Sequence, residues 1–149
     1  MMQNKLKIGT IEQLFVSEKE SKKRVFKDIL NIDTQGIIGD KFYNKDINRS
    51  VLLTSTLAYN LLAFENITFE YGNLGENILV NFNPYDLEEG TLLHINNAIL
   101  QITKECTICN LIKSIDEKAP KILEHDRGVF AKVIQEGTLH INDEIKILN

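Results

Sequence analysis

Short apolar runs separated by turn-forming residues are the feature that most restricts the fold of this chain. Their length and close spacing are typical of β-strands in a barrel or a sandwich. The alternation of strands with long helices that accompanies a parallel sheet is missing from the sequence. The sequence therefore predicts a mainly β protein, a closed or partly open β-barrel with a few short helices.

The expected strands and helices follow from the periodicity of apolar residues and from the turn- and cap-forming residues between them. We expect strands over residues 5–16, 24–32, 51–54, 67–71, 76–80, 91–95, 99–103, 128–134 and 144–148. A helix over 57–64 is expected, capped by Ser55 or Thr54, with a second helix over 110–118 and a short turn from Pro120 to residue 124. Asn96 and Asn97 suit a type I′ hairpin turn, because Asn tolerates positive φ. The core is expected to hold Tyr59, Phe64, Phe69 and Tyr71.

Length and composition predict one domain over residues 1–149 with a substantial apolar core, since 43% of the residues are hydrophobic. No apolar run approaches the roughly 20 residues of a membrane-spanning helix. The first residues carry scattered charges and lack the apolar stretch of a signal peptide. We therefore expect a cytoplasmic protein that does not enter a membrane.

The charge distribution limits the ligands that the chain can bind. A net charge of −4 does not favour nucleic acid. Residues 1–49 hold 10 of the 17 basic residues, and residues 50–103 hold none. Bidentate recognition of an anion would depend on one of the three arginines, Arg24, Arg49 and Arg127.

Four polar loops stand out between the predicted strands. Their sequences are GIIGD (36–40), NRS (48–50), GNLGEN (72–77) and RGVFAKV (127–133). Together they contain two of the three arginines and five of the eight glycines. This concentration predicts one site assembled from the four loops at the mouth of the barrel.

The two cysteines, Cys106 and Cys109, lie in the segment TKECTICNL between the third and fourth loops. A zinc site would need about four ligands, yet the histidines His125 and His140 are fifteen positions apart, which does not match a zinc motif. A thioredoxin-like pair would require a surrounding βαβ pattern, which is missing. Both interpretations are disfavoured but stay open, beside one reactive thiol or no chemical role.

These motifs, in this order, resemble the MOSC domain, named for its place at the C-terminus of molybdenum cofactor sulfurases. The resemblance covers about residues 20–148 and rests on GIIGD, NRSVLLT, GNLGEN, EEGTLLHINNAILQIT, the cysteine segment and RGVFAKVIQEGTLHINDEIKI. It implies a barrel related to that of pyruvate kinase. It also implies binding of a molybdenum cofactor, a pterin that carries a dithiolate and a phosphate.

The resemblance implies roles for five polar or glycine positions. Arg49 and Arg127 match positions that would hold the pterin phosphate, with Gly128 beside them in the cofactor site. Asp40 and Asn77 also match motif positions, where they would either bind the polar edge of the pterin or hold the loops in place. Both alternatives stay open at this point.

The family's functional cysteine either ligates the metal or holds a persulfide. Spacing from Gly90 and to Arg127 favours Cys109, whereas the Lys-Glu-Cys sequence found in some members favours Cys106. A helix beginning at Cys109 would lower the pKa of its thiol.

Two functions from different classes follow. One is a molybdenum-dependent enzyme in which a cysteine thiolate ligates the metal during reduction of N-oxygenated small molecules. The alternative is a sulfur carrier that passes a persulfide sulfur to a cofactor or partner protein, and a sensor domain without chemistry is a third. An enzyme of this kind would need a partner reductase, and a carrier would need a sulfur donor protein. The basic hairpin at 19–27 is a candidate docking surface for such a partner.

Overall fold

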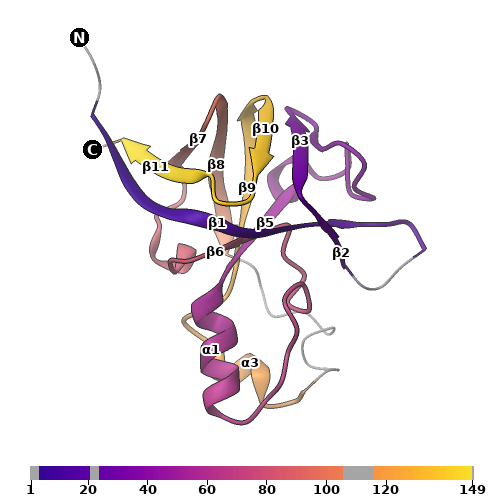
Figure 1. Cartoon of the computed structure of the whole chain (residues 1–149), viewed down its shortest axis with the longest axis vertical. Helices are drawn as coiled ribbons and strands as arrows, with labels where there is room; N and C mark the ends of the chain where they lie inside the picture. Colours follow the sequence, from indigo (N-terminus) through magenta and orange to yellow (C-terminus); the bar gives the residue numbers. More distant parts are fainter. Residues whose placement is uncertain (1–3, 21–23, 106–115, 149) are drawn as a thin grey trace.

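The computed structural model describes residues 4–20, 24–105 and 116–148. Its main feature is a closed β-barrel, as the sequence predicts (Figure 1). Around the barrel the strands run in the order β1 (Lys5–Ser17), β6 (Ile78–Val80), β5 (Val51–Ser55), β9 (Val129–Gln135), β8 (Ala98–Glu105), β7 (Leu92–Ile95) and β11 (Glu144–Leu148). The antiparallel pairing of β11 with β1 closes the ring.

The long strand β1 makes closure possible because it pairs with β11 along its first half and with β6 along its second. The register shifts between Lys7 and Gly9, where the periodicity of the sequence is also imperfect. A bulge of this kind bends a strand and increases its twist, which a barrel requires. Gly9 packs against Asn81 and Phe82, so a larger side chain would not fit there.

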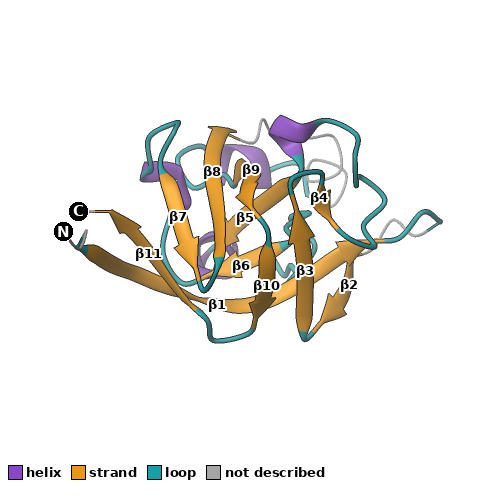
Figure 2. Ribbon diagram, turned by 90° about the horizontal axis from the view of Figure 1, so that it is seen from above, coloured by secondary structure: helices purple, strands orange, loops and turns teal. Residues whose placement is uncertain are grey.

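A second, three-stranded sheet lies beside the barrel (Figure 2). It contains β10 (Gly137–His140), β3 (Ile29–Asp33) and β4 (Gly36–Ile37), whereas β2 (Arg24–Lys27) pairs with β1. The single strand expected over 24–32 is therefore wrong, since the chain changes sheets at Asp28. Strand β10 was not expected, because Gly137 read as a turn residue.

Four short helical segments complete the described chain: η1 (Ile47–Arg49), α1 (Thr56–Phe64), η2 (Pro84–Asp86) and α3 (Ala119–Ile122). Ser55 caps α1, its hydroxyl accepting a hydrogen bond from the Leu57 amide at 2.9 Å. The core placement of two aromatic residues is wrong, because Phe64 is 85% exposed and Tyr71 is 45% exposed.

Apolar side chains fill the barrel at alternate positions, as Val129, Ala131 and Val133 of β9 do. A second apolar cluster lies between α1 and α3. Residues 67–71 form no strand, and the expected helix over 110–118 falls largely outside the described residues. Within the described ranges, no helix is long and apolar enough to cross a membrane.

Candidate functional site

The end of the barrel where β8 stops and β9 begins brings together two of the four singled-out loops. Glu105, the last residue of β8, pairs with Val129, the first residue of β9. The Thr103 hydroxyl donates a hydrogen bond to the carbonyl of Asn48, which ties η1 to β8. Val129 also pairs with Leu53, so α1, which follows β5, leaves the barrel at this end. We call this end the mouth.

Arg49 lies at the mouth on η1. Its guanidinium carbon is 4.8 Å from the centre of the Phe130 ring, within the range of a cation–π contact. Arg49 is exposed, so the contact orients the side chain while the charge stays accessible. The second and fourth loops are thus brought together, as the sequence predicts.

Arg127 is half-buried immediately before β9. Its Nη2 donates a hydrogen bond of 3.3 Å to the Tyr85 hydroxyl, and its guanidinium carbon is 5.5 Å from the centre of the Tyr85 ring. Asn83 holds the neighbouring loop, since its Nδ2 donates to Asp126 at 3.1 Å and to the His125 carbonyl at 3.3 Å. Tyr85 was not foreseen as a site residue, because nothing in the local sequence links positions 85 and 127.

The third arginine, Arg24, contacts the third loop. Its Nε donates a 3.0 Å hydrogen bond to the carbonyl of Gly75 in the third loop. Leu52 connects this loop to the fourth, because its methyl groups lie beside both Gly75 and Gly128. The sequence contains only three arginines. Their rarity alone could have identified Arg24 as a candidate site residue beside Arg49 and Arg127.

Asp40 and Asn77 form one buried network that joins the first loop to the third. The Asp40 Oδ1 accepts from the Ser17 amide at 2.6 Å, and its Oδ2 accepts from the Phe42 amide at 2.9 Å. The Asn77 Oδ1 accepts from the Leu52 amide at 3.0 Å.

Asn77 completes the network through its Nδ2. This group donates to the Phe15 carbonyl at 3.3 Å and lies 3.5 Å from the Asp40 Oδ1. The protein itself thus occupies the polar atoms of both side chains. These bonds favour the loop-holding alternative over direct contact with a pterin.

A second buried network holds the GNLGEN loop against α1. The Tyr59 hydroxyl donates to the Glu76 Oε2 at 2.6 Å and accepts from the amides of Gly72 and Leu74 at 3.0 and 3.2 Å. Glu76 is fully buried. Burial raises the pKa of its carboxyl, an effect that the hydrogen bond from Tyr59 and the charge of Arg24 partly oppose.

The predicted thiols, Cys106 and Cys109, lie outside the described residues. The described chain reaches the mouth at Glu105, directly before Cys106. Among the described residues, no group of three or more His, Cys, Asp or Glu side chains is placed to hold a metal ion.

Comparison with known protein families decides the identity of this barrel. The sequence pattern of the MOSC domain matches residues 33–146, most of the chain. The chain belongs to the MOSC domain family. None of the curated proteins compared with this MOSC domain matches it significantly.

Solved structures share the fold of this MOSC domain at low sequence identity. The YUAD protein of Bacillus subtilis superposes with a TM-score of 0.84 at 19% identity, over 98% of both chains. YiiM of Geobacillus stearothermophilus gives 0.78 at 13% identity, over 95% of this chain and 76% of its own. YiiM of Escherichia coli gives 0.72 at 15% identity, over 95% of this chain and 70% of its own. These likenesses establish the fold alone.

Gly128 has a packing role in the MOSC barrel. A Cβ atom at this position would lie 2.6 Å from the Leu53 carbonyl oxygen and 2.6 Å from the Thr54 Oγ1. Only a glycine lets β9 approach β5 this closely. The contact fixes the strand that follows Arg127.

Gly128→Ala is therefore expected to lower the free energy of unfolding by about 1–3 kcal/mol, through overpacking against backbone that cannot move aside. Urea unfolding measures the change. Glu124→Ala, a change at an exposed position nearby, is the control. A Gly128→Ala protein as stable as the wild type would contradict the close approach.

The donor set at the mouth fits an anionic, polar cofactor. Arg49 contacts the Phe130 ring and Arg127 contacts Tyr85 directly before β9, while Arg24 contacts the Gly75 carbonyl of the third loop. Guanidinium groups match phosphate oxygens in charge and geometry. The described residues can therefore supply the phosphate contacts that a pterin cofactor needs.

Proposed function

We propose that this MOSC domain binds a molybdenum cofactor at the mouth and reduces N-oxygenated small molecules there. Arg127 and Arg49 hold the phosphate, and a cysteine thiolate, Cys109 ahead of Cys106, ligates the metal. The observation that supports this most is that two of the MOSC motif loops meet where β9 begins, with Arg49 against the Phe130 ring and Arg127 directly before the strand. A soft thiolate suits molybdenum.

The protein's own residues bind and orient in this proposal. Tyr85 orients Arg127, and the Phe130 ring orients Arg49. Asp40, Asn77 and Glu76 hold the loops that shape the mouth. When bound, the cofactor supplies two-electron redox chemistry.

The proposed reaction needs an electron donor. An N-hydroxylated substrate takes up two electrons and two protons, its N–O bond breaks, and the oxygen leaves as water. A partner reductase must deliver the electrons. The basic hairpin at 19–27 is the proposed docking surface, because an acidic partner surface would be attracted to it.

Arg127→Ala is expected to weaken cofactor retention by about 1.5–3 kcal/mol, the usual worth of a hydrogen bond to a charged group. Pterin fluorescence after repeated gel filtration measures how much cofactor stays bound. Tyr85→Phe, which keeps the ring but removes the oxygen that accepts from Arg127, should show a smaller loss. Lys45→Ala, an exposed cation on another loop, is the control. Equal retention in Arg127→Ala and Lys45→Ala would remove Arg127 from the site.

An activity assay tests the function itself. Cofactor-loaded protein, supplied with a reduced dye as electron donor, should convert an N-hydroxylated amidine to the amidine. A protein without this activity that instead gains cyanide-labile sulfur on incubation with a sulfur donor would favour the sulfur carrier.

A further inference from the structure

A polar groove of about 310 Å³ lies on the outside of the barrel, where β1, β11 and β7 meet. Its walls carry Lys5, His94, Asn96, Asp143, Glu144 and Lys146. The groove is remote from the mouth, because Asn96 precedes the start of β8 and the mouth lies at the end of that strand. Eight residues of strand separate the two ends by roughly 25 Å.

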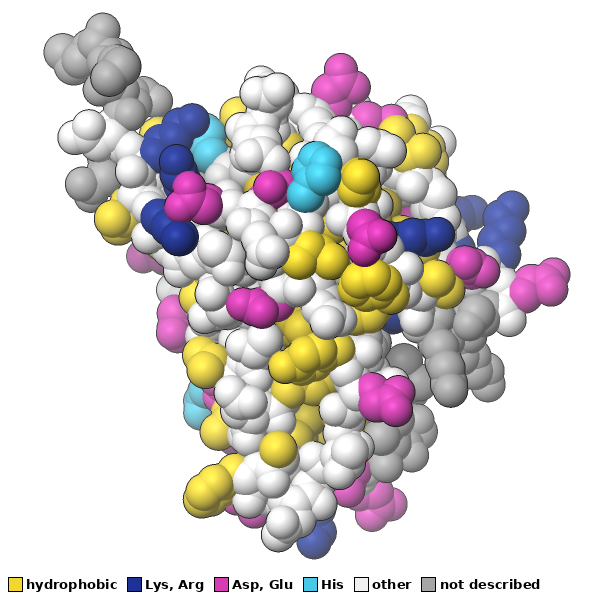
Figure 3. Space-filling model, viewed as in Figure 1, with side chains coloured by type: hydrophobic (Ala, Val, Ile, Leu, Met, Phe, Trp, Pro, Cys, Tyr) yellow, Lys and Arg dark blue, Asp and Glu magenta, His cyan; other side chains and the backbone are white. Residues whose placement is uncertain are grey.

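Basic side chains are aligned across the three strands at this groove. Lys146 pairs in register with Lys7 on β1 and with His94 on β7. Like charges directly opposite one another destabilise a sheet. Figure 3 shows Lys or Arg side chains gathered beside a histidine over the outer ends of β1 and β11.

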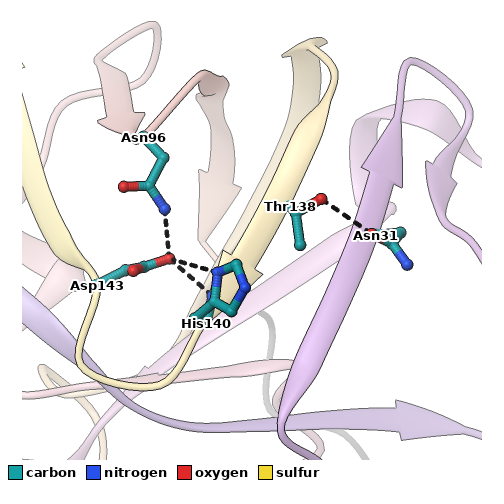
Figure 4. A network of polar contacts seen from close by, with 5 residues as sticks. All are labelled: Asn31, Asn96, Thr138, His140 and Asp143. Carbon is teal, nitrogen blue, oxygen red and sulfur yellow. Dashed lines mark hydrogen bonds and ion pairs between the residues drawn. The ribbon is translucent and has the colours of Figure 1, made fainter.

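Both acidic side chains at the groove already have partners. Glu144 forms an ion pair with Lys7 at 3.2 Å. The Asp143 Oδ2 accepts from the Asn96 Nδ2 at 2.6 Å and from the His140 amide at 2.7 Å, and it lies 3.5 Å from the His140 Nδ1 (Figure 4). Across the described ranges, neither Lys5 nor Lys146 has an ion-pair partner.

His94 adds a second, independent observation. Its Nε2 is buried and has no hydrogen-bond partner among the described residues. A buried polar atom without a partner is rare and calls for one. Burial and the charge of Lys5 lower the pKa of His94, and an anion that neutralises Lys5 and accepts from the ring would oppose the second effect.

We propose that this groove is a second binding site, which takes a small molecule through its phosphate or carboxylate group. Lys5 and Lys146 supply the charge, and the His94 ring supplies the directed hydrogen bond. The site is separate from the mouth, so this proposal does not depend on the molybdenum proposal and is tested independently of it.

The test follows the three histidine rings of the chain by NMR while inorganic phosphate, and in a parallel series malonate, is added. Sodium chloride holds the ionic strength constant. His94 signals should shift saturably with at least one of the two anions, and the preferred anion identifies the ligand group. His125, which lies beside Tyr85 away from the groove, reports separately on any anion bound at the mouth.

Lys146→Gln should raise the half-saturating anion concentration about tenfold, the usual effect of one charge-assisted contact. Lys19→Gln, an exposed cation on the hairpin after β1, should leave it unchanged. The proposal is overturned if neither anion shifts the His94 signals saturably. It is also overturned if Lys146→Gln and wild-type protein titrate alike.

Discussion

Replacing Glu76 with alanine is expected to lower the free energy of unfolding by about 3 kcal/mol. The change removes the acceptor of the Tyr59 hydroxyl and an acceptor of the Gly72 amide, both of them buried. Each buried polar group left without a partner costs about 1–3 kcal/mol, and the vacated volume adds to the loss. The GNLGEN loop, which depends on this network, should lose order first.

Glu76 also makes stability depend on pH. The folded pKa is raised above the ordinary value of 4.5, chiefly by burial. Its stabilising contribution is therefore complete below 4.5 and is lost as pH rises through the folded pKa. Glu76→Gln resembles the protonated carboxyl and does not titrate. Relative to the wild type, this variant should gain stability as pH rises.

Urea unfolding of the wild type and both variants at about pH 5 and about pH 8 measures these effects. Other titrating groups are shared, so the difference between wild type and Glu76→Gln isolates the carboxyl. A difference that is equal at the two pH values would contradict the raised pKa. A Glu76→Ala protein as stable as the wild type would show that the network contributes nothing.

Cys109→Ala is expected to lower molybdenum retention by about tenfold or more. Loss of a residue that merely supports a metal ligand typically costs 10–100-fold in affinity, so loss of a ligand should cost at least as much. Reductase activity should fall with the metal. The pterin should be retained better than the metal, because Arg49 and Arg127 are unchanged.

Cys106→Ala is the matched control, since it removes the other thiol of the same segment. Metal content by mass spectrometry and pterin content by fluorescence distinguish the two variants. Loss in Cys106→Ala with retention in Cys109→Ala would transfer the role to Cys106. Full metal retention and activity in both variants would refute the thiolate proposal.

The barrel was predictable because its strands carry their own signals. The apolar runs, the Asn96–Asn97 turn and the Ser55 cap are local features, and local features can be read from a sequence. The turn itself is confirmed, but only Asn96 has positive φ, so it is not the type I′ turn that was expected. The asparagine pair therefore predicted where the turn lies but not its backbone conformation.

The wrong predictions concern segments whose structure is determined by tertiary contacts. Apolar residues typical of strands lie on both sides of Asp28, so nothing in the local sequence of 24–32 reveals that the chain moves from one sheet to the other. Residues 67–71 have strand-like composition, but Ile67 and Phe69 instead pack in the cluster under α1. Phe64 lies on a different side of α1 from the buried Ala58, Tyr59 and Leu62. Which side of the helix is buried depends on how α1 packs against the rest of the protein.

The site was predictable at the level of loops and not of individual contacts. Clustering of glycine and arginine identified the four loops, which do meet in two connected groups. The pairing of Arg127 with Tyr85 spans 42 positions, and the Gly75 contact of Arg24 spans 51. Contacts over such distances follow from strand order, which local patterns do not specify.

The molybdenum and pterin content of freshly purified protein tests the central claim most directly. The protein should be produced in cells that make the cofactor, and both components should be quantified per chain. The proposal predicts close to one molybdenum and one pterin per chain, with both strongly reduced in a protein that lacks Arg127 and Cys109. Wild-type protein that contains neither, despite an available cofactor, would contradict it.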